Sequence, residues 1–149
     1  MPSARDERWP LGARVIHWAL ALVLVLDLFV LEEGDPPHRY LGYVAVGLVV
    51  VRLLWGAYGS GVVAFANYPR SLPTVVYFLV WSTVLALGVT GFLMGLDVFW
   101  GNELLEDIHS VLSKLLMGWI GLHLAGVARD AIRFRRPTWK AMINGRRFP

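Results

Sequence analysis

Apolar residues fill four long stretches of the chain, and short polar segments separate them. The stretches cover about residues 14–31, 37–58, 72–95 and 106–128. Each has the roughly 17 to 25 mostly apolar residues that a helix needs to cross a bilayer at about 1.5 Å per residue. The pattern therefore predicts an all-α fold, an integral membrane four-helix bundle formed as a single domain over residues 1–149.

The basic residues gather in the segments that four spans would place on one side of a membrane. The N-terminal arm, the loop after the second stretch and the C-terminal tail contain Arg5, Arg8, Arg14, Arg70, Arg129, Arg133, Arg135, Arg136, Lys140, Arg146 and Arg147. In the other two loops Arg39 is the only basic residue, and the acidic residues are Glu32, Glu33, Asp35, Asp97, Glu103, Glu106 and Asp107. Because short loops rich in Lys and Arg stay in the cytoplasm, both termini are expected to be cytoplasmic. The basic tail then contacts anionic membrane lipid, and we expect no nucleic-acid binding.

Composition restricts the chemistry that such a bundle can support. Of the 149 residues, 56% are hydrophobic and 17% are charged, which is typical of a chain whose surface faces lipid. The chain has no cysteine, which excludes thiolate metal sites, iron–sulfur clusters and haem attached through thioether bonds. Metal chemistry in this chain must therefore use histidine, methionine or carboxylates.

Four histidines lie in or at the ends of the predicted spans, where a polar ring is costly without a partner. His17 and His123 fall near the cytoplasmic ends of their helices, and His38 and His109 fall near the outer ends. His109 and His123 are 14 residues apart, so their directions differ by only roughly 40° and they lie roughly 21 Å apart along one helix. We expect His38 to face His109 at the outer level and His17 to face His123 at the inner level.

Two imidazoles from different helices at one level are the axial ligands that a six-coordinate haem iron requires. Two such pairs predict two haems. A zinc site would need three or four ligands at one level, so zinc is not expected. The alternative is that each histidine is a hydrogen-bonded packing residue in a haem-free membrane scaffold.

The intramembrane charges suggest partners for a haem. Arg52 is 14 residues from His38, so it shares a helix face with it at the inner level and is expected to meet the inner propionates. Arg14 and Arg39 could do the same for the inner and outer haem, or could simply extend to the nearest interface. Asp27 and Lys114 lie at comparable depth and are expected either to form a structural ion pair or to handle protons for a quinone.

Five segments carry a resemblance to a known family: RVIHWALA (14–21), HRYLGYVAVGLVVVRLLWG (38–56), LALGVTGFLMG (85–95), IHSVLSKLLMGWIGLHLAGV (108–127) and AMINGRRF (141–148). They resemble the bacterial cytochrome b561 and nickel–iron hydrogenase cytochrome b group, four-helix proteins of the inner membrane that bind two b-type haems. The resemblance implies haem ligation by the four histidines and a single dihaem cytochrome domain. The segment after Gly61 is shorter than in many relatives, so docking to a hydrogenase is not expected.

The resemblance also implies a function, which is electron transfer between membrane quinone and a periplasmic redox protein. Seven carboxylates on the outer loops favour a basic partner such as a soluble cytochrome c. An alternative is a superoxide oxidase, an enzyme that passes electrons from superoxide to ubiquinone. The acidic loops would repel the superoxide anion, although Arg39 could offset this field.

Overall fold

The computed structural model describes residues 8–133, 135 and 137–146. Arg5, Arg136 and Arg147 therefore lie outside the described residues. Within the described part all regular structure is helical, and it comprises α1 (Leu11–Phe29), α2 (Pro36–Tyr58), η1 (Gly61–Val63), η2 (Phe65–Asn67), α3 (Leu72–Met94), η3 (Asp97–Phe99), α4 (Glu103–Arg133), η4 (Thr138–Lys140) and α5 (Ala141–Asn144).

The four long helices, α1 to α4, are long and apolar enough to cross a membrane, as the sequence predicts. The helix α4 differs most from expectation, because its 31 residues extend past the predicted limits of 106 and 128 at both ends. At its start the side chain of Asn102 accepts a hydrogen bond from the Leu105 amide at 3.0 Å, and Glu103 and Glu106 lie in the first turn. A capping side chain and acidic residues near the helix N-terminus both stabilise this early start.

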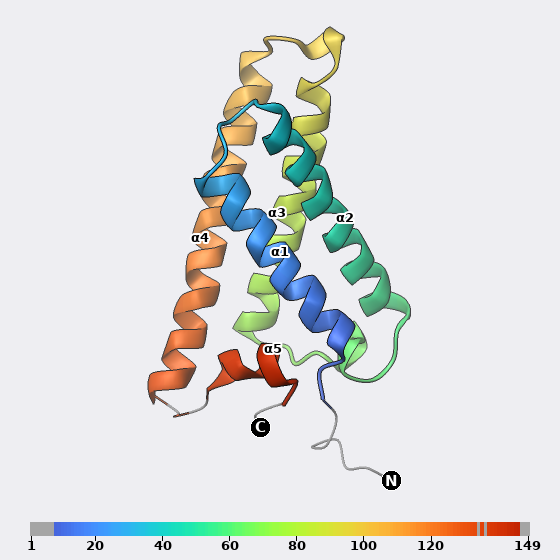
Figure 1. Ribbon diagram of the computed structural model, residues 1–149, viewed down its shortest axis with the longest axis vertical. Helices are drawn as coiled ribbons and strands as arrows, with labels where there is room; N and C mark the ends of the chain where they lie inside the picture. Colours follow the sequence, from blue (N-terminus) through green and yellow to red (C-terminus); the bar gives the residue numbers. More distant parts are fainter. Residues whose placement is uncertain (1–7, 134, 136, 147–149) are drawn as a thin grey trace.

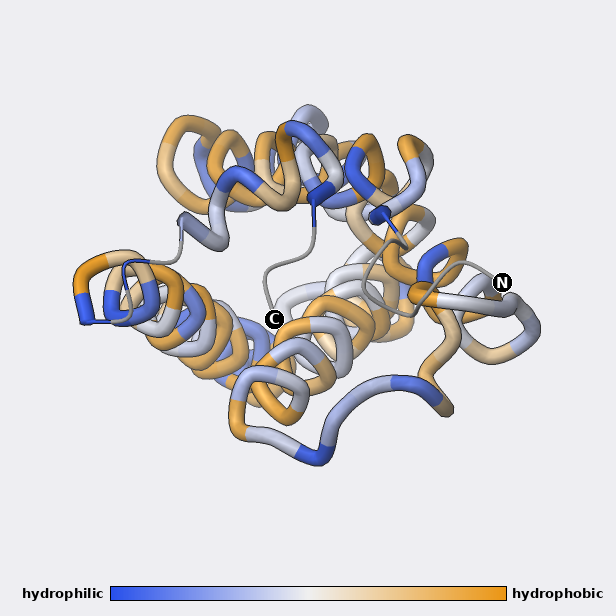
Figure 2. The backbone as a smooth tube through the Cα atoms, turned by 90° about the horizontal axis from the view of Figure 1, so that it is seen from below, coloured by the Kyte–Doolittle hydropathy of each residue, from blue (hydrophilic) through white to orange (hydrophobic). Residues whose placement is uncertain are grey.

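The long helices pack in chain order around the bundle (Figures 1 and 2). The helix α1 packs against α2, α2 packs against α3, and α3 packs against α4 along much of its length. Within the described residues α4 makes no extensive backbone contact with α1 or α2. The main buried cluster is small and comes mostly from the first three helices, with Leu116 as the one member from α4: Leu20, Val23, Leu24, Ala45, Val49, Val84 and Leu116.

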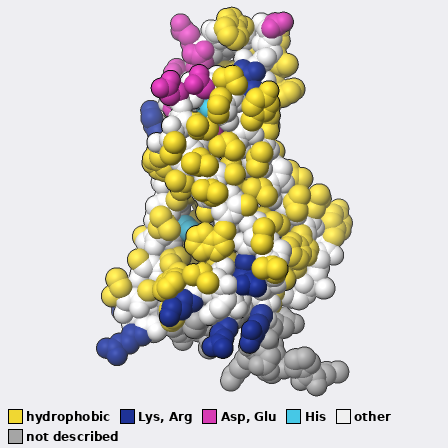
Figure 3. Space-filling view, in the orientation of Figure 1, with side chains coloured by type: hydrophobic (Ala, Val, Ile, Leu, Met, Phe, Trp, Pro, Cys, Tyr) yellow, Lys and Arg dark blue, Asp and Glu magenta, His cyan; other side chains and the backbone are white. Residues whose placement is uncertain are grey.

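Charge and apolar surface separate along the bundle axis (Figure 3). Exposed apolar side chains cover the middle, as expected of a lipid-facing surface. One end, which we name the acidic end, carries exposed Glu32, Glu33, Asp35, Asp97, Glu103, Glu106 and Asp107. The opposite end, which we name the basic end, carries exposed Arg8, Arg70, Arg129, Arg133, Arg135, Lys140 and Arg146.

The first and last described segments meet at the basic end (Figure 1). The amide of Trp9 donates a hydrogen bond to the Gly145 carbonyl at 2.9 Å, and the indole of Trp18 donates to the Met142 carbonyl at 2.9 Å. Gly145 has a φ of 77°, and a Cβ there would lie 3.0 Å from the Trp9 carbonyl, so this turn requires glycine. The described ends of the chain therefore lie at the same end of the bundle, as four spans require.

Close packing of α2 on α3 depends on Gly88, because a Cβ at this position would overlap the side chain of Val46. We expect Gly88→Val to destabilise the bundle by about 1–3 kcal/mol through overpacking. Thermal unfolding in detergent, followed by circular dichroism, measures this loss. Val89→Leu is the matched control, since Val89 is 59% exposed. Equal unfolding temperatures for the two variants would contradict the contact.

Candidate functional site

The four histidines form two pairs inside the bundle. His17 on α1 faces His123 on α4 with 6.3 Å between ring centroids, and His38 on α2 faces His109 on α4 with 6.2 Å. The planes of the two rings form an angle of 64° in the first pair and 79° in the second. The structure thus brings together the histidines that depth and helical phase had matched. Each pair joins α4 to a helix, α1 or α2, with which its backbone makes no extensive contact in the described part of the chain.

The ring separation suits two nitrogen ligands on opposite sides of one metal ion. Two metal–nitrogen bonds of about 2.0–2.1 Å, plus about one further ångström from each nitrogen to its ring centroid, give a total of about 6.0–6.2 Å, close to the two observed separations. Among the described residues no group of three or more His, Asp or Glu side chains gathers as a metal site. Each pair brings two imidazoles together, which is compatible with a metal whose other ligands come from a cofactor.

Several glycines of α2 and α4 have open space at the position of a Cβ, and one glycine of α3 lies beside a histidine. A Cβ added to Gly47, Gly118, Gly121 or Gly126 would meet no atom within 4 Å. At Gly91 a Cβ would lie 3.4 Å from His109 Cε1, so this imidazole lies against the backbone of α3. The glycine at 91 thus allows the ring of His109 to approach α3 closely.

We call His38 and His109, at the acidic end, the outer pair, and His17 and His123 the inner pair. In the outer pair, a neighbouring side chain lies close to the Nδ1 atom of each ring. The Thr90 hydroxyl lies 2.7 Å from His109 Nδ1, within hydrogen-bond distance. Asp27 Oδ1 lies 3.1 Å from His38 Nδ1, within ion-pair distance, although the two atoms are not aligned for a hydrogen bond. These contacts leave Nε2 of both rings available as the ligand atom.

The contact of Asp27 with His38 corrects an expectation. No ion pair joins Asp27 to Lys114 in the described part of the chain, and Lys114 is exposed. Depth alone suggested that pair, but the ammonium group lies on the outer surface of α4 while Asp27 points into the bundle. Since Asp27 is only 12% exposed, its neighbour is the imidazole that shares its environment.

The inner pair has aromatic neighbours. The ring of His17 contacts Trp18 edge-on at 5.3 Å, and the ring of His123 contacts Tyr77 at 5.5 Å. Tyr77 is followed along α3 by Trp81, with 6.5 Å between ring centroids. In the described residues no side chain forms a hydrogen bond or ion pair with either inner ring. The two pairs therefore differ in their surroundings.

The structure places Arg52 in a cage that the sequence did not reveal. This side chain is 6% exposed, and its guanidinium lies 5.3 Å from the Phe65 ring, 5.8 Å from the Tyr68 ring and 5.4 Å from the Trp81 ring. It donates hydrogen bonds to the Val63 carbonyl and to the Tyr68 hydroxyl. The aromatic residues in the loop after α2 were the signal for this cation–π cage. Propionate binding by Arg52 stays a prediction.

The other two candidate arginines lie at opposite ends. Arg14 donates to the Ile143 carbonyl at 2.5 Å, so it holds the C-terminal turn at the basic end. Arg39 is exposed at the acidic end, and its Cζ lies 3.7 Å from where a Cβ on Gly95 would be. Their expected contacts with propionates stay predictions.

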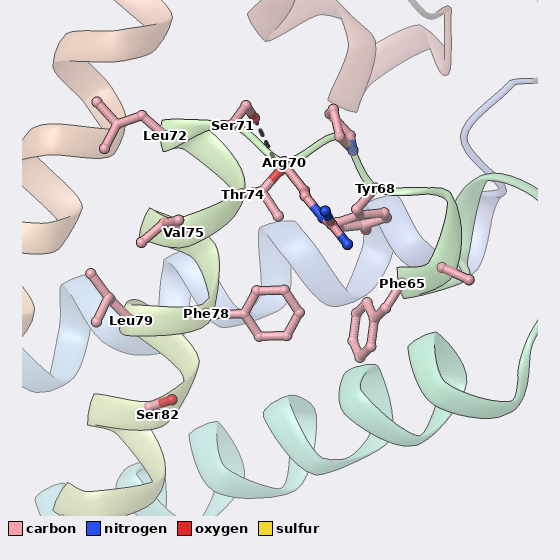
Figure 4. A pocket seen from close by; sticks show the side chains of 12 residues that line it. Phe65, Tyr68, Arg70, Ser71, Leu72, Thr74, Val75, Phe78, Leu79 and Ser82 are labelled. Carbon is pink, nitrogen blue, oxygen red and sulfur yellow. Dashed lines mark hydrogen bonds between the residues drawn. The ribbon is translucent and has the colours of Figure 1, made fainter.

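A groove of about 780 Å³ opens at the basic end, beside the start of α3 (Figure 4). Phe65, Val75, Phe78 and Leu79 supply apolar lining. The hydroxyl groups come from Tyr68, Ser71, Thr74 and Ser82, and the charge comes from Arg70. The hydroxyls of Ser71 and Thr74 lie 3.2 Å apart. No pattern in the sequence had pointed to this groove.

These features define a class of helical membrane protein in which histidines from different helices face each other at two levels. A family model described as prokaryotic cytochrome b561 matches residues 8–145, so the chain belongs to this family, as the sequence predicts. Comparisons with curated proteins and with solved structures gave no match. Membership implies a membrane protein of electron transport that binds haem b, which argues against the haem-free scaffold.

The cage around Arg52 generates a prediction about the loop between α2 and α3. Arg52→Met is expected to cost about 1–3 kcal/mol, because the buried Val63 carbonyl and the Tyr68 hydroxyl lose their donor. Limited proteolysis of residues 59–71 and thermal unfolding measure the effect. Arg70→Met serves as control, since Arg70 is exposed. Equal protection of the loop in both variants would refute the cage as its anchor.

Proposed function

We propose that this chain is a dihaem b-type cytochrome that carries electrons across the bacterial inner membrane. The observation that carries the proposal is the presence of two imidazole pairs, at 6.3 and 6.2 Å, on one shared helix. In this proposal His17 and His123 hold the inner haem, and His38 and His109 hold the outer one. Each bound haem supplies one-electron iron chemistry.

The protein contributes ligation, orientation and a dry environment. The helix α4 provides one ligand at each level, so a single rigid element would set the spacing of the two sites at roughly 21 Å along its axis. The apolar outer surface of the bundle keeps both levels inside the hydrocarbon region. We infer that the basic end is cytoplasmic and the acidic end periplasmic, because Lys and Arg in short loops stay in the cytoplasm.

The acidic end is the proposed docking surface for a basic periplasmic redox protein, such as a soluble cytochrome c. Its seven exposed carboxylates create a negative field near the outer pair. Such fields raise association rates with a partner of opposite charge, and salt weakens them. The same field disfavours superoxide as a substrate, since superoxide is an anion.

The groove beside α3 is the proposed quinone site. Its apolar lining suits a lipid-soluble ring, and its hydroxyls can donate hydrogen bonds to the quinone oxygens. Phe78 in the lining contacts Trp81 at 5.3 Å, and the line of rings continues through Tyr77 to His123. Oxidation of one quinol releases two electrons and two protons, and two one-electron acceptors at the acidic end take the electrons.

The first test is the haem content of the purified protein. We expect two haems per chain, measured by pyridine haemochrome against protein, and bis-imidazole spectra in the oxidised and dithionite-reduced states. His123→Ala should lose the inner haem and His38→Ala the outer one. Lys114→Met is the control and should keep both, since Lys114 is an exposed α4 residue between the two levels. One haem in the unaltered chain would overturn the dihaem assignment.

The second test addresses the partners. The reconstituted protein should be reduced by a quinol and oxidised by a basic cytochrome c, and the rate of the second reaction should fall as salt is added. Thr74→Trp fills the groove and should lower quinol reduction at least tenfold while sparing cytochrome c. Val89→Trp, on the exposed surface of the same helix near the acidic end, should spare both. Reduction by superoxide alone, with no response to quinol, would favour the superoxide oxidase.

A further inference from the structure

The two histidine pairs differ in what lies against the ring nitrogen that faces away from the partner ring. This difference carries an inference that rests on the proposed dihaem function. In the outer pair, Asp27 and Thr90 lie at the Nδ1 atoms of His38 and His109. The inner rings contact aromatic edges instead. A metal-bound imidazole is oriented and made more basic by an acceptor on its second nitrogen, so the two levels are built differently.

The Thr90 hydroxyl has backbone acceptors of its own beside its contact with His109. Thr90 is 8% exposed, and its hydroxyl lies 3.1 Å from the carbonyls of both Ala86 and Leu87 on its own helix. When the hydroxyl proton is directed at these carbonyls, the oxygen offers a lone pair at 2.7 Å to His109 Nδ1. In that arrangement His109 carries its proton on Nδ1, which leaves Nε2 unprotonated and able to bind iron.

Asp27 lies at ion-pair distance from His38 Nδ1 and brings a carboxylate to that atom. A carboxyl group within an apolar span is costly unless it has a partner. Lys114 does not supply that partner, and the structure places His38 Nδ1 3.1 Å from Asp27 Oδ1. A carboxylate there stabilises the imidazole with its proton on Nδ1 and increases the electron donation of Nε2 to a bound metal.

We propose that Asp27 and Thr90 are positioning residues of the outer site, and that Asp27 lowers the midpoint potential of the haem held there. Stronger donation from His38 favours the ferric state over the ferrous state. Among the described residues the inner pair has no such carboxylate, so this contribution acts on the outer site alone. Residues of all four long helices thereby meet at one level: Asp27 on α1, His38 on α2, Thr90 on α3 and His109 on α4.

The experiment is a redox titration of the haem-loaded protein, monitored by absorbance and by low-spin electron paramagnetic resonance. Asp27→Asn should raise the potential of one haem, changing its oxidised-to-reduced ratio about tenfold at fixed potential, which is about 59 mV for one electron. Thr90→Val should give a smaller shift of the same haem and alter its resonance signal. The second haem should stay unchanged in both variants.

Two matched controls accompany these variants. Thr83→Val removes a hydroxyl that is equally buried at 8% and bonds only the Leu79 carbonyl, at 2.7 Å. Asp97→Asn removes an exposed carboxylate at the acidic end. Neither should move a potential. A shift of equal size in Asp97→Asn would mean that general surface charge, and not the contact with His38, sets the value, and this would overturn the proposal.

Other outcomes are also decisive. Unchanged potentials in both Asp27→Asn and Thr90→Val, with two haems still bound, would overturn this inference and leave the dihaem function standing. Fewer than two haems in the unaltered chain would instead overturn the proposed function. If Asp27→Asn does not take up the outer haem, Thr90→Ser and Thr90→Val are compared. Only the serine keeps a hydroxyl oxygen that can accept a hydrogen bond from His109 Nδ1. Equal midpoint potentials of the outer haem in these two variants would therefore refute the positioning role of Thr90.

Discussion

The structure depends on a constraint of the membrane interior, where a polar ring must find a partner. The helix α4 carries two such rings, His109 and His123, and both face rings from other helices. Since α4 has extensive backbone contact with α3 alone among the described long helices, the imidazole pairs occupy the side where apolar packing is sparse. A cofactor bound between the rings would complete the core of the bundle. We therefore regard ligation and folding of this bundle as coupled.

Charged side chains at the two ends have different tasks. At the basic end, buried Arg52 anchors the loop after α2, and Arg14 anchors the C-terminal turn, so arginines that looked like candidates for a cofactor also hold the structure together. At the acidic end, the carboxylates are exposed: Glu103 and Glu106 stabilise the start of α4 by their position, and their charges stay accessible to a partner. The two ends thus differ in the roles of their charged side chains as well as in the sign of the charge.

The outer and inner levels are also unlike, because each is built from different neighbours. Polar side chains of α1 and α3 lie against the outer rings, whereas Trp18 and Tyr77 lie against the inner ones. A polar contact fixes the tautomer and orientation of an imidazole, and an aromatic edge mainly fills space. In the proposed dihaem protein, two sites with the same kind of ligand pair would therefore hold their haems with different properties.

The sequence by itself determined the four spans, the family and the matching of His17 with His123 and His38 with His109. Apolar length and helical phase are local properties, so they can be read along one chain. Tertiary structure alone decided the neighbours of Asp27, Thr90 and Arg52. Comparable depth had suggested Lys114 for Asp27, and this was wrong, because depth does not specify which way a side chain points. The rotation of each helix about its axis, and the path of the loops between helices, follow from packing across the whole bundle.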